Sequence, residues 1–253
     1  LQFLADALKL LGKEDIIHSK ADRLLFILAP IIVFMGAFVG FAVIPFAYGV
    51  VAADMNVGLF LVLALTSVEV VGVIMAGWAS NSKWAVLGSM REVAQMESYE
   101  MPLGISALAV VLLGGTLNFT DLVQQQGGGF WNWYVFRGPF ALLAFFIFGT
   151  AALASLKRAP FDLPEAESEL VSGYNTEYSG KRFAGFFLGE FANIYLMSAI
   201  ITTLFLGGWQ VPGESAAAQS ESWLLQLAGL GIFVAKASIG CFIVIWIRWT
   251  LPR

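Results

Sequence analysis

The sequence has very few of the side chains that build metal, redox or nucleophilic sites. Its 253 residues include one cysteine, Cys241, and one histidine, His18. A single thiol excludes an internal disulfide framework, a thiolate zinc site and an iron–sulfur cluster ligated by this chain alone. A single imidazole leaves little basis for a histidine metal site or a catalytic triad. We expect Cys241 to be a buried packing residue and His18 to lie in an interfacial loop.

Charged residues are also scarce, at 13% of the chain, and the formal net charge is −4. The basic residues form no stripe interleaved with exposed aromatics, so nothing indicates nucleic-acid binding. The run QQQGGG lacks the strand, helix and lysine of a phosphate-binding loop, so nucleotide binding is not expected. Residues 1–23 contain four basic and four acidic side chains, a composition that does not support a cleavable signal peptide. Because there is no initiating Met, we expect a fragment or a processed product.

Hydrophobic residues, in contrast, make up 58% of the chain, and the mean hydropathy is +0.78. Apolar runs recur at close to the ~20 residues that a helix needs to cross a bilayer. No segment alternates with the period of two of a membrane β-barrel, so the predicted fold is an all-α polytopic membrane domain over residues 1–253. Six spans are predicted, at Leu24–Phe46, Val57–Ala79, Tyr99–Leu117, Pro139–Leu156, Phe183–Leu206 and Trp223–Trp246.

Lysine and arginine are unevenly distributed between the predicted loops. Twelve of the fourteen lie on one side, in segments 1–23, 80–98 and 157–182 and in the C-terminal tail. The loops on the other side contain only Arg137, so the positive-inside rule places the first set on the cytoplasmic side. Within segment 1–23, apolar residues recur at helical spacing, at Leu1, Leu4, Leu8 and Leu11. This spacing predicts an amphipathic helix lying in the plane of the interface.

Four ionisable residues fall inside or at the edge of the predicted spans: Glu69, Glu100, Glu190 and Lys236. A charge in hydrocarbon costs about 3 kcal/mol even on the permissive insertion scale, so such residues usually face a protein interior or a wet cavity. Burial favours a neutral carboxyl and a nearby cation favours its charged form, an opposition that suits a proton relay. The alternative is that Glu100 or Glu190 forms a fixed interhelical ion pair with Lys236. No partner for Glu69 is evident in the sequence.

Two further carboxylates, Glu92 and Glu97, lie close to Arg91 in the sequence. On one helix, Glu97 and Glu100 would share a face. Both Glu92 and Glu97 are therefore possible members of the relay. The alternative is that they belong to a solvated loop on the inner surface.

Segment 157–182, KRAPFDLPEAESELVSGYNTEYSGKR, is predicted to be an acidic loop on the cytoplasmic side. Its carboxylates are Asp162, Glu165, Glu167, Glu169 and Glu177. Pro160 and Pro164 prevent the preceding span from continuing. Apolar and aromatic residues, including Tyr174 and Tyr178, are mixed among the acidic ones. This mixture favours a folded lining of the inner surface over a free tail.

This segment resembles the signature loop of the respiratory complex I membrane subunit that contains the quinone chamber, called the H subunit in bacteria and subunit one in mitochondria. Other motifs similar to that family follow in the same order, namely LADALKLLGKEDI, GWASNSKWAVLGSMREVAQMESYE, FLGEFANI, LFLGGW and WIRWTLPR. The resemblance covers essentially the whole chain. It implies a subunit of eight helices, so the first and last spans would be missing here.

The resemblance further implies a non-redox subunit of a proton-translocating NADH:quinone oxidoreductase, with quinone as substrate and with FMN and iron–sulfur clusters only in partner subunits. Those partners would be the hydrophilic arm with its terminal cluster and the small and antiporter-like membrane subunits, in a bacterial or mitochondrial inner membrane. By matching position, the chamber and its acidic lining would contain Asp6, Arg91, Asp162, Glu165, Glu167, Glu169 and Glu177. The buried polar route would contain Glu100, Glu190 and Lys236.

Ser155 departs from the family, which usually has a glutamate three residues before the arginine of RAPFD, here Arg158. A serine cannot hold an exchangeable charge. Glu92 and Glu97 stand where small or aliphatic residues are expected, and Glu69 is also unusual, so we hypothesise that they replace the lost carboxylate. Two other functions stay open. One is the membrane subunit of an energy-converting nickel–iron hydrogenase, and the other is a secondary transporter, although its paired broken spans are not evident.

Overall fold

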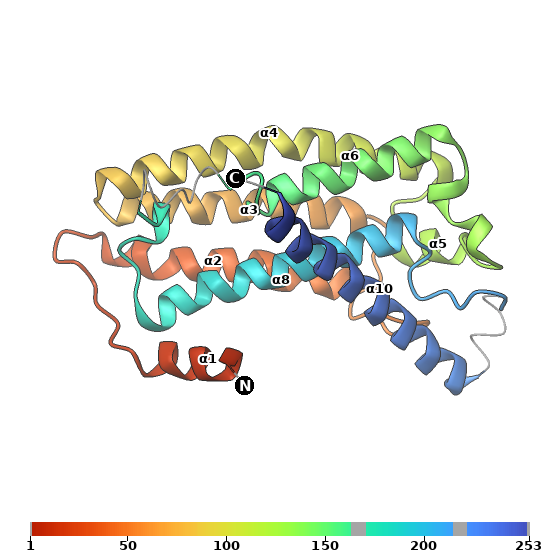
Figure 1. Cartoon of the computed structure of the whole chain (residues 1–253), viewed down its shortest axis with the longest axis horizontal. Helices are drawn as coiled ribbons and strands as arrows, with labels where there is room; N and C mark the ends of the chain where they lie inside the picture. The colour runs from red at the N-terminus through yellow and green to blue at the C-terminus, as the bar shows by residue number, and fades with distance from the viewer. Residues whose placement is uncertain (1, 163–170, 215–221, 252–253) are drawn as a thin grey trace.

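The computed structural model describes residues 2–162, 171–214 and 222–251 of the chain (Figure 1). Within these ranges the regular elements are helices, and the only strand-like pairing is one isolated bridge between Ala47 and Val50. The prediction of an all-α fold is confirmed. The elements are α1 (Gln2–Gly12), α2 (Arg23–Gly40), η1 (Phe41–Val43), α3 (Gly58–Ala79), α4 (Lys83–Gly114), α5 (Phe119–Gln124), η2 (Phe130–Asn132), η3 (Tyr134–Phe136), α6 (Pro139–Ser155), η4 (Gly173–Asn175), α8 (Gly180–Phe205) and α10 (Trp223–Thr250).

Five helices in the described part of the chain are long and apolar enough to cross a membrane. They are α2 with its η1 extension, α3, α4, α8 and α10. A sixth, α6, is equally apolar but has 17 residues. These six helices correspond to the six predicted spans, so the prediction of a multi-pass helical membrane protein is confirmed.

Helix α4 departs from the prediction. The predicted span began at Tyr99 after a loop over residues 80–98, but α4 is a continuous helix of 32 residues that begins at Lys83. At 1.5 Å per residue it is about 48 Å long, against ~30 Å of hydrocarbon. The predicted loop is wrong because Glu92, Gln95 and the other polar residues there are good helix formers, although they are too polar to extend an apolar span. Glu92 therefore stands on a helix and not in a loop.

The connections alternate between the two ends of the bundle (Figure 1). The described parts of the connections that follow α1, α3 and α6 lie at one end, which we call the inner end. Those that follow α2, α4 and α8 lie at the opposite, outer end. The basic segments therefore gather at the inner end, as the count of lysines and arginines predicted.

Two helices lie at the edge of the bundle. Helix α10 crosses α8 obliquely, and α1 lies beside the first turns of α8 (Figure 1). In α1, Leu8 is 70% exposed and Leu11 66% exposed. Apolar residues left uncovered on a short helix are what an interfacial helix would present to lipid. The contact between α1 and α8 also forms one wall of a groove described below.

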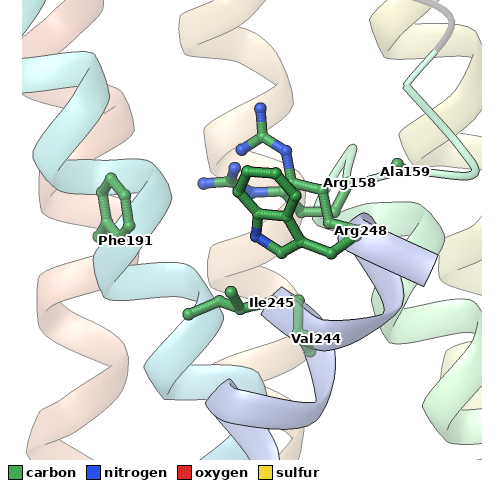
Figure 2. Close-up of a pocket in the computed structure, with 7 residues that line it drawn as sticks. Arg158, Ala159, Phe191, Val244, Ile245 and Arg248 are labelled. Atoms are coloured by element: carbon green, nitrogen blue, oxygen red, sulfur yellow. The ribbon is translucent and has the colours of Figure 1, made fainter. Parts of the chain in front are cut away.

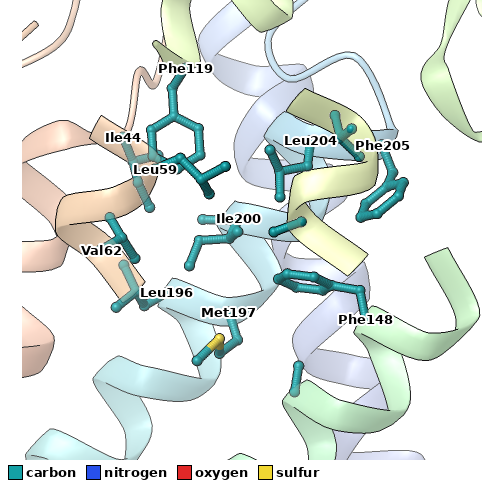
Figure 3. Packing of buried hydrophobic residues seen from close by; sticks show 14 of the residues in the cluster. Ile44, Leu59, Val62, Phe119, Phe148, Leu196, Met197, Ile200, Leu204 and Phe205 are labelled. Carbon is teal, nitrogen blue, oxygen red and sulfur yellow. The ribbon is translucent and has the colours of Figure 1, made fainter. Parts of the chain in front are cut away.

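The larger of two apolar clusters in the described residues lies toward the outer end. Aromatic and aliphatic side chains from several helices interdigitate there, among them Leu59, Phe119, Phe148, Leu204 and Phe205 (Figure 3). All five are at most 1% exposed. Without a hydrophobic driving force between helices in lipid, such close packing is a main source of association between them. It fixes α8 against α3 and α6, and hence the positions of the polar residues further down α8.

The second apolar cluster lies at the inner end and includes tyrosines from segment 157–182. Tyr178 stacks on Phe26 with ring centroids 4.0 Å apart, and Tyr174 meets Phe186 edge to face at 5.2 Å. The part of the segment from residue 171 onward is therefore folded against the bundle, in agreement with the prediction of a lining. Residues 163–170, with Glu165, Glu167 and Glu169, lie outside the described residues.

The same segment passes close to α4 at Gly88. A Cβ atom at Gly88 would lie 2.6 Å from the Cα atom of Gly173 and 3.2 Å from the backbone nitrogen of Tyr174. Both neighbours are backbone atoms, which cannot turn aside as a flexible side chain can. Gly88 is therefore required for the contact between α4 and η4.

We expect Gly88→Ala to lower the stability of the protein by about 1–3 kcal/mol, since overpacking displaces backbone. The matched control is Gly104→Ala in the same helix, where an added Cβ would meet nothing within 4 Å. Thermal unfolding of the detergent-solubilised protein checks the difference. Equal melting temperatures for the two variants would contradict the assignment.

Candidate functional site

Charged side chains meet inside the inner half of the bundle, around the residues that follow α6. Lys157 and Arg158 are adjacent, yet they contact different helices. The Nζ atom of Lys157 lies 2.5 Å from Oε1 of Glu92 on α4. The Nη2 atom of Arg158 lies 2.9 Å from Oε1 of Glu190 on α8. The start of the acidic loop is therefore fixed to two helices by two ion pairs.

The ion pair between Lys157 and Glu92 is almost completely buried. The side chains are 7% and 0% exposed, and Lys157 has the uncommon φ of +55°. Its ammonium also lies 5.6 Å from the centre of the Tyr174 ring. Burial lowers the pKa of Lys157, but its charge interactions with Glu92, Tyr174 and Glu69 and its hydrogen bond to Glu92 together outweigh this effect and hold that pKa well above its ordinary value. Lys157 is therefore a cation at neutral pH.

Glu69 on α3 is the second buried carboxylate of this cluster, at 4% exposure. Its partner, which the sequence did not reveal, is Asn193 on α8. The Nδ2 atom of Asn193 donates a hydrogen bond of 2.6 Å to Oε2 of Glu69. Glu69 also interacts electrostatically with Lys157, Glu190 and Glu100. The structure thus brings four predicted glutamates from α3, α4 and α8 to one cluster, namely Glu69, Glu92, Glu100 and Glu190.

Glu100 lies on α4 at the edge of this cluster and is half-buried. The hydroxyl of Ser67 on α3 donates a hydrogen bond of 3.0 Å to its Oε2 atom. Its Oε1 atom is buried without a hydrogen-bond partner among the described residues. A carboxyl oxygen in that position can bind a proton or accept a hydrogen bond from a water molecule, as a proton relay requires.

Lys236 on α10 lies apart from these glutamates. Its Nζ atom donates to the carbonyl oxygens of Leu206 at 2.7 Å and Gly208 at 3.0 Å, and lies 4.3 Å from the centre of the Trp133 ring. Those carbonyls follow the last turn of α8 at the outer end. The alternative of a fixed ion pair between Lys236 and Glu100 or Glu190 is therefore wrong, because Glu190 pairs with Arg158 and Lys236 caps α8.

The remaining predicted residues lie nearer the surface or outside the described ranges. Asp6 on α1 and Arg91 and Glu97 on α4 are exposed, while Asp162 and Glu177 are half-buried. Ser155 is buried at 6% exposure, at the last turn of α6. Glu92 and Glu97 therefore differ sharply, because only Glu92 reaches the buried cluster.

Beside this cluster is a cavity of about 510 Å³ between the start of the acidic loop, α8 and the end of α10 (Figure 2). Its lining combines two guanidinium groups with apolar and aromatic side chains, namely Arg158, Ala159, Phe191, Val244, Ile245, Arg248 and Trp249. Arg158 also lies 5.4 Å from the centre of the Phe191 ring. The same arginine thus joins the cavity to Glu190.

Two further hollows continue this cavity along α8. A groove of about 430 Å³ between α1 and α8 is lined by Asp6, Lys9 and Phe187 among others, and it shares Phe191 with the first cavity. A smaller hollow of about 160 Å³ contains Glu190 and Tyr174 and shares Arg158 and Arg248 with the first cavity. Phe183, Phe187 and Phe191 recur every fourth residue and so line one face of α8.

This arrangement suits a flat, largely apolar ligand with hydrogen-bond acceptors. Aromatic walls can hold a ring, and the guanidinium groups of Arg158 and Arg248 can donate hydrogen bonds to its oxygens. Glu190 lies close to these oxygens through its ion pair with Arg158. Among the described residues, no group of three or more His, Cys, Asp or Glu side chains could hold a metal ion.

Sequence reasoning missed Lys157, Arg158 and Asn193 as members of the site. In the sequence, Lys157 and Arg158 stood out only as members of a basic loop. Their proximity to Glu92 and Glu190 depends on how the helices pack. A cation directly after an apolar span was the available signal. Nothing in the sequence pointed to Asn193.

Comparisons with known proteins show which family the chain resembles. A family model described as NADH dehydrogenase matches residues 1–253. Relatives that are the H subunit of NADH-quinone oxidoreductase include proteins of Anaeromyxobacter dehalogenans (51% identity over 263 residues), Chlorobaculum tepidum (47% over 257) and Rickettsia conorii (51% over 253). All three alignments cover 100% of this chain, and they cover 64%, 72% and 72% of the respective relatives. The chain thus spans about two thirds of the length of the first of these proteins.

We expect Asn193→Leu to destabilise the protein by about 1–3 kcal/mol, because it leaves an oxygen of the buried Glu69 without its donor. The control is Thr203→Val on the same helix, whose hydroxyl bonds only to the carbonyl of Ile200 within α8. Thermal unfolding in detergent measures both. A larger loss for the Thr203 variant would contradict the role given to Asn193.

Proposed function

The chain belongs to the NADH dehydrogenase family as a relative of the H subunit of NADH-quinone oxidoreductase, and we propose that it forms the quinone chamber and couples quinone reduction to proton translocation. Its partners in this proposal are the hydrophilic arm and the small and antiporter-like membrane subunits of the complex. The membrane is the bacterial inner membrane or, in a eukaryote, the mitochondrial inner membrane. The family membership and the multi-pass helical fold support this proposal.

The observation that carries the proposal is the cavity between the acidic loop, α8 and α10. Its volume of about 510 Å³ lies within the range of small-molecule sites. A quinone headgroup is a flat ring with two carbonyl oxygens, so it needs apolar walls and hydrogen-bond donors. Phe191 and Trp249 supply the first, and Arg158 and Arg248 supply the second.

The groove between α1 and α8 is then the path for the isoprenoid tail. Phe183, Phe187 and Leu188 give it an apolar wall, and Phe191 connects it to the headgroup cavity. Asp6 and Lys9 on α1 lie at its polar rim. An amphipathic helix at the interface suits this position, because a lipid-soluble substrate must enter from the membrane.

Reduction of the quinone consumes two electrons and two protons and yields the quinol. The electrons come from an iron–sulfur cluster of a partner subunit, because one cysteine in this chain cannot ligate a cluster. The two protons are taken up from the inner aqueous side, and Glu190, whose carboxylate pairs with Arg158 beside the cavity, binds each proton before passing it on. As those protons leave, the charge of the carboxylate cluster changes.

That change of charge is the signal that the buried route passes on in this proposal. Glu190, Glu69 and Glu100 interact electrostatically across α8, α3 and α4. Lys236 stands further along, at the outer end of α8, and is the last ionisable residue of the proposed route. Buried ionisable residues in membrane segments typically serve such relays.

The acidic segment and Arg91 on α4 form the lining that faces the hydrophilic arm in this proposal. We assign this role to Asp162, Glu177 and Arg91, together with Glu165, Glu167 and Glu169. The folded packing of Tyr174 and Tyr178 against the bundle supports a fixed position for the described part of this lining.

We expect Arg158→Met to lower kcat/KM for quinone by about 10- to 100-fold in the intact complex, since a hydrogen bond from a charged donor is lost. Lys181→Met is the matched control, because Lys181 is an exposed cation near the same end that lines none of the three cavities. NADH-driven reduction of a short-chain quinone gives both values.

A photoreactive quinone tests the chamber directly. Labelling of the complex should modify this chain near Phe191 or Trp249, and excess unlabelled quinone should prevent it. An intact complex in which this chain carries no competable label would overturn the proposed function.

A further inference from the structure

The buried ion pair at the start of the acidic loop has a third member. Lys157 pairs with Glu92 on α4, and it also interacts electrostatically with Glu69 on α3. Tyr174 of η4 is the other titratable group that acts on Lys157. One ammonium group thus pairs with one buried carboxylate and acts electrostatically on a second, which lies on a different helix.

We propose that Lys157 is a positioning residue of the charge relay, holding Glu92 and transmitting changes of charge or position at the start of the acidic loop to Glu69. This inference rests on the proposed function. It adds a cation to the route, and it assigns Glu92 a role that Glu97 does not share.

The physical basis is competition for one positive charge. In a protein interior a unit charge acts strongly over several ångströms, because the effective dielectric is far below that of water. When Glu92 is ionised, it holds the ammonium on the side of α4. When Glu92 gains a proton, or when the loop draws Lys157 away, the field of the ammonium at Glu69 changes.

The position of Lys157 in the chain links this competition to the cavity. Its neighbour Arg158 lines the cavity and pairs with Glu190. Residues 154–161, which join α6 to the acidic loop, are called the hinge below. Gln95 on α4 binds this hinge, since its Nε2 atom donates to the carbonyl oxygens of Ala154 and Phe161, both at 2.8 Å. A displacement of the hinge therefore acts on both ion pairs together.

Ser155 lies two residues before Lys157 and cannot carry a charge. Glu92 supplies a buried carboxylate at the same hinge from the neighbouring helix, with 0% exposure, whereas Glu97 on that helix is exposed. The hypothesis that carboxylates on α4 replace a glutamate at position 155 therefore holds for Glu92 in this proposal, with Lys157 as its counter-ion.

The test uses the intact complex reconstituted in vesicles, with two readouts: competable photoreactive quinone labelling, and protons translocated per quinone reduced. We expect Lys157→Met to keep the labelling but to lower the proton ratio at least about twofold.

The double variant Glu92→Gln with Lys157→Met removes both charges and leaves no unpaired charge, so it should assemble. Its proton ratio should remain low, because Glu69 still lacks its cation. Glu97→Gln is the control and should leave both readouts unchanged.

A purely structural ion pair predicts the opposite for the double variant, namely a native proton ratio once the unpaired charge is gone. That result would overturn the inference, as would failure of both variants to assemble, which would make the pair structural. If the unmodified complex shows no competable labelling, the proposed chamber is contradicted instead. Failure of this inference and failure of the proposed function therefore give different results.

Discussion

A charged side chain inside an apolar bundle needs a counter-charge or a hydrogen-bond partner within the bundle, and this requirement organises the inner half of the molecule. Helix α6 ends at Ser155, and the next two charged residues, Lys157 and Arg158, find partners on opposite sides. Lys157 is fixed to α4 through Glu92, and Arg158 is fixed to α8 through Glu190. The acidic loop therefore begins from a point that three helices hold in common. The cavity beside it takes one wall from Arg158 and Ala159, and the described later part of the loop packs on α2 and α8.

One consequence is that ligand contact and charge pairing share a residue. Arg158 lines the cavity of about 510 Å³ and at the same time neutralises Glu190. A ligand oxygen that accepts from another N–H of Arg158 would therefore share the guanidinium with that carboxylate. In the proposed function, this sharing would link occupancy of the cavity to the charge state of the cluster.

The sequence was sufficient for the fold because hydropathy and the distribution of lysine and arginine act at the scale of whole helices. It was insufficient for α4, where polar helix formers from Lys83 to Tyr99 continue the helix beyond the apolar span. It also pointed to Glu69, Glu100 and Glu190 by their cost in an apolar chain, and to Glu92 by its position beside Arg91. Their partners could not be predicted, because Asn193 and Lys157 lie 124 and 65 residues away from theirs and meet them only through helix packing.

The buried pair of Glu92 and Lys157 also bears on why a serine can stand at position 155. A lone glutamate in an apolar interior has a large desolvation cost, whereas a carboxylate introduced together with its own ammonium adds no net charge. In our proposal the pair supplies a carboxylate that can exchange a proton at the start of the acidic loop, without changing the net charge there. A neutral pair of leucine or methionine would pack at least as well, so packing alone does not explain two buried charges here. Their presence is better explained by a role in which the charge itself is used.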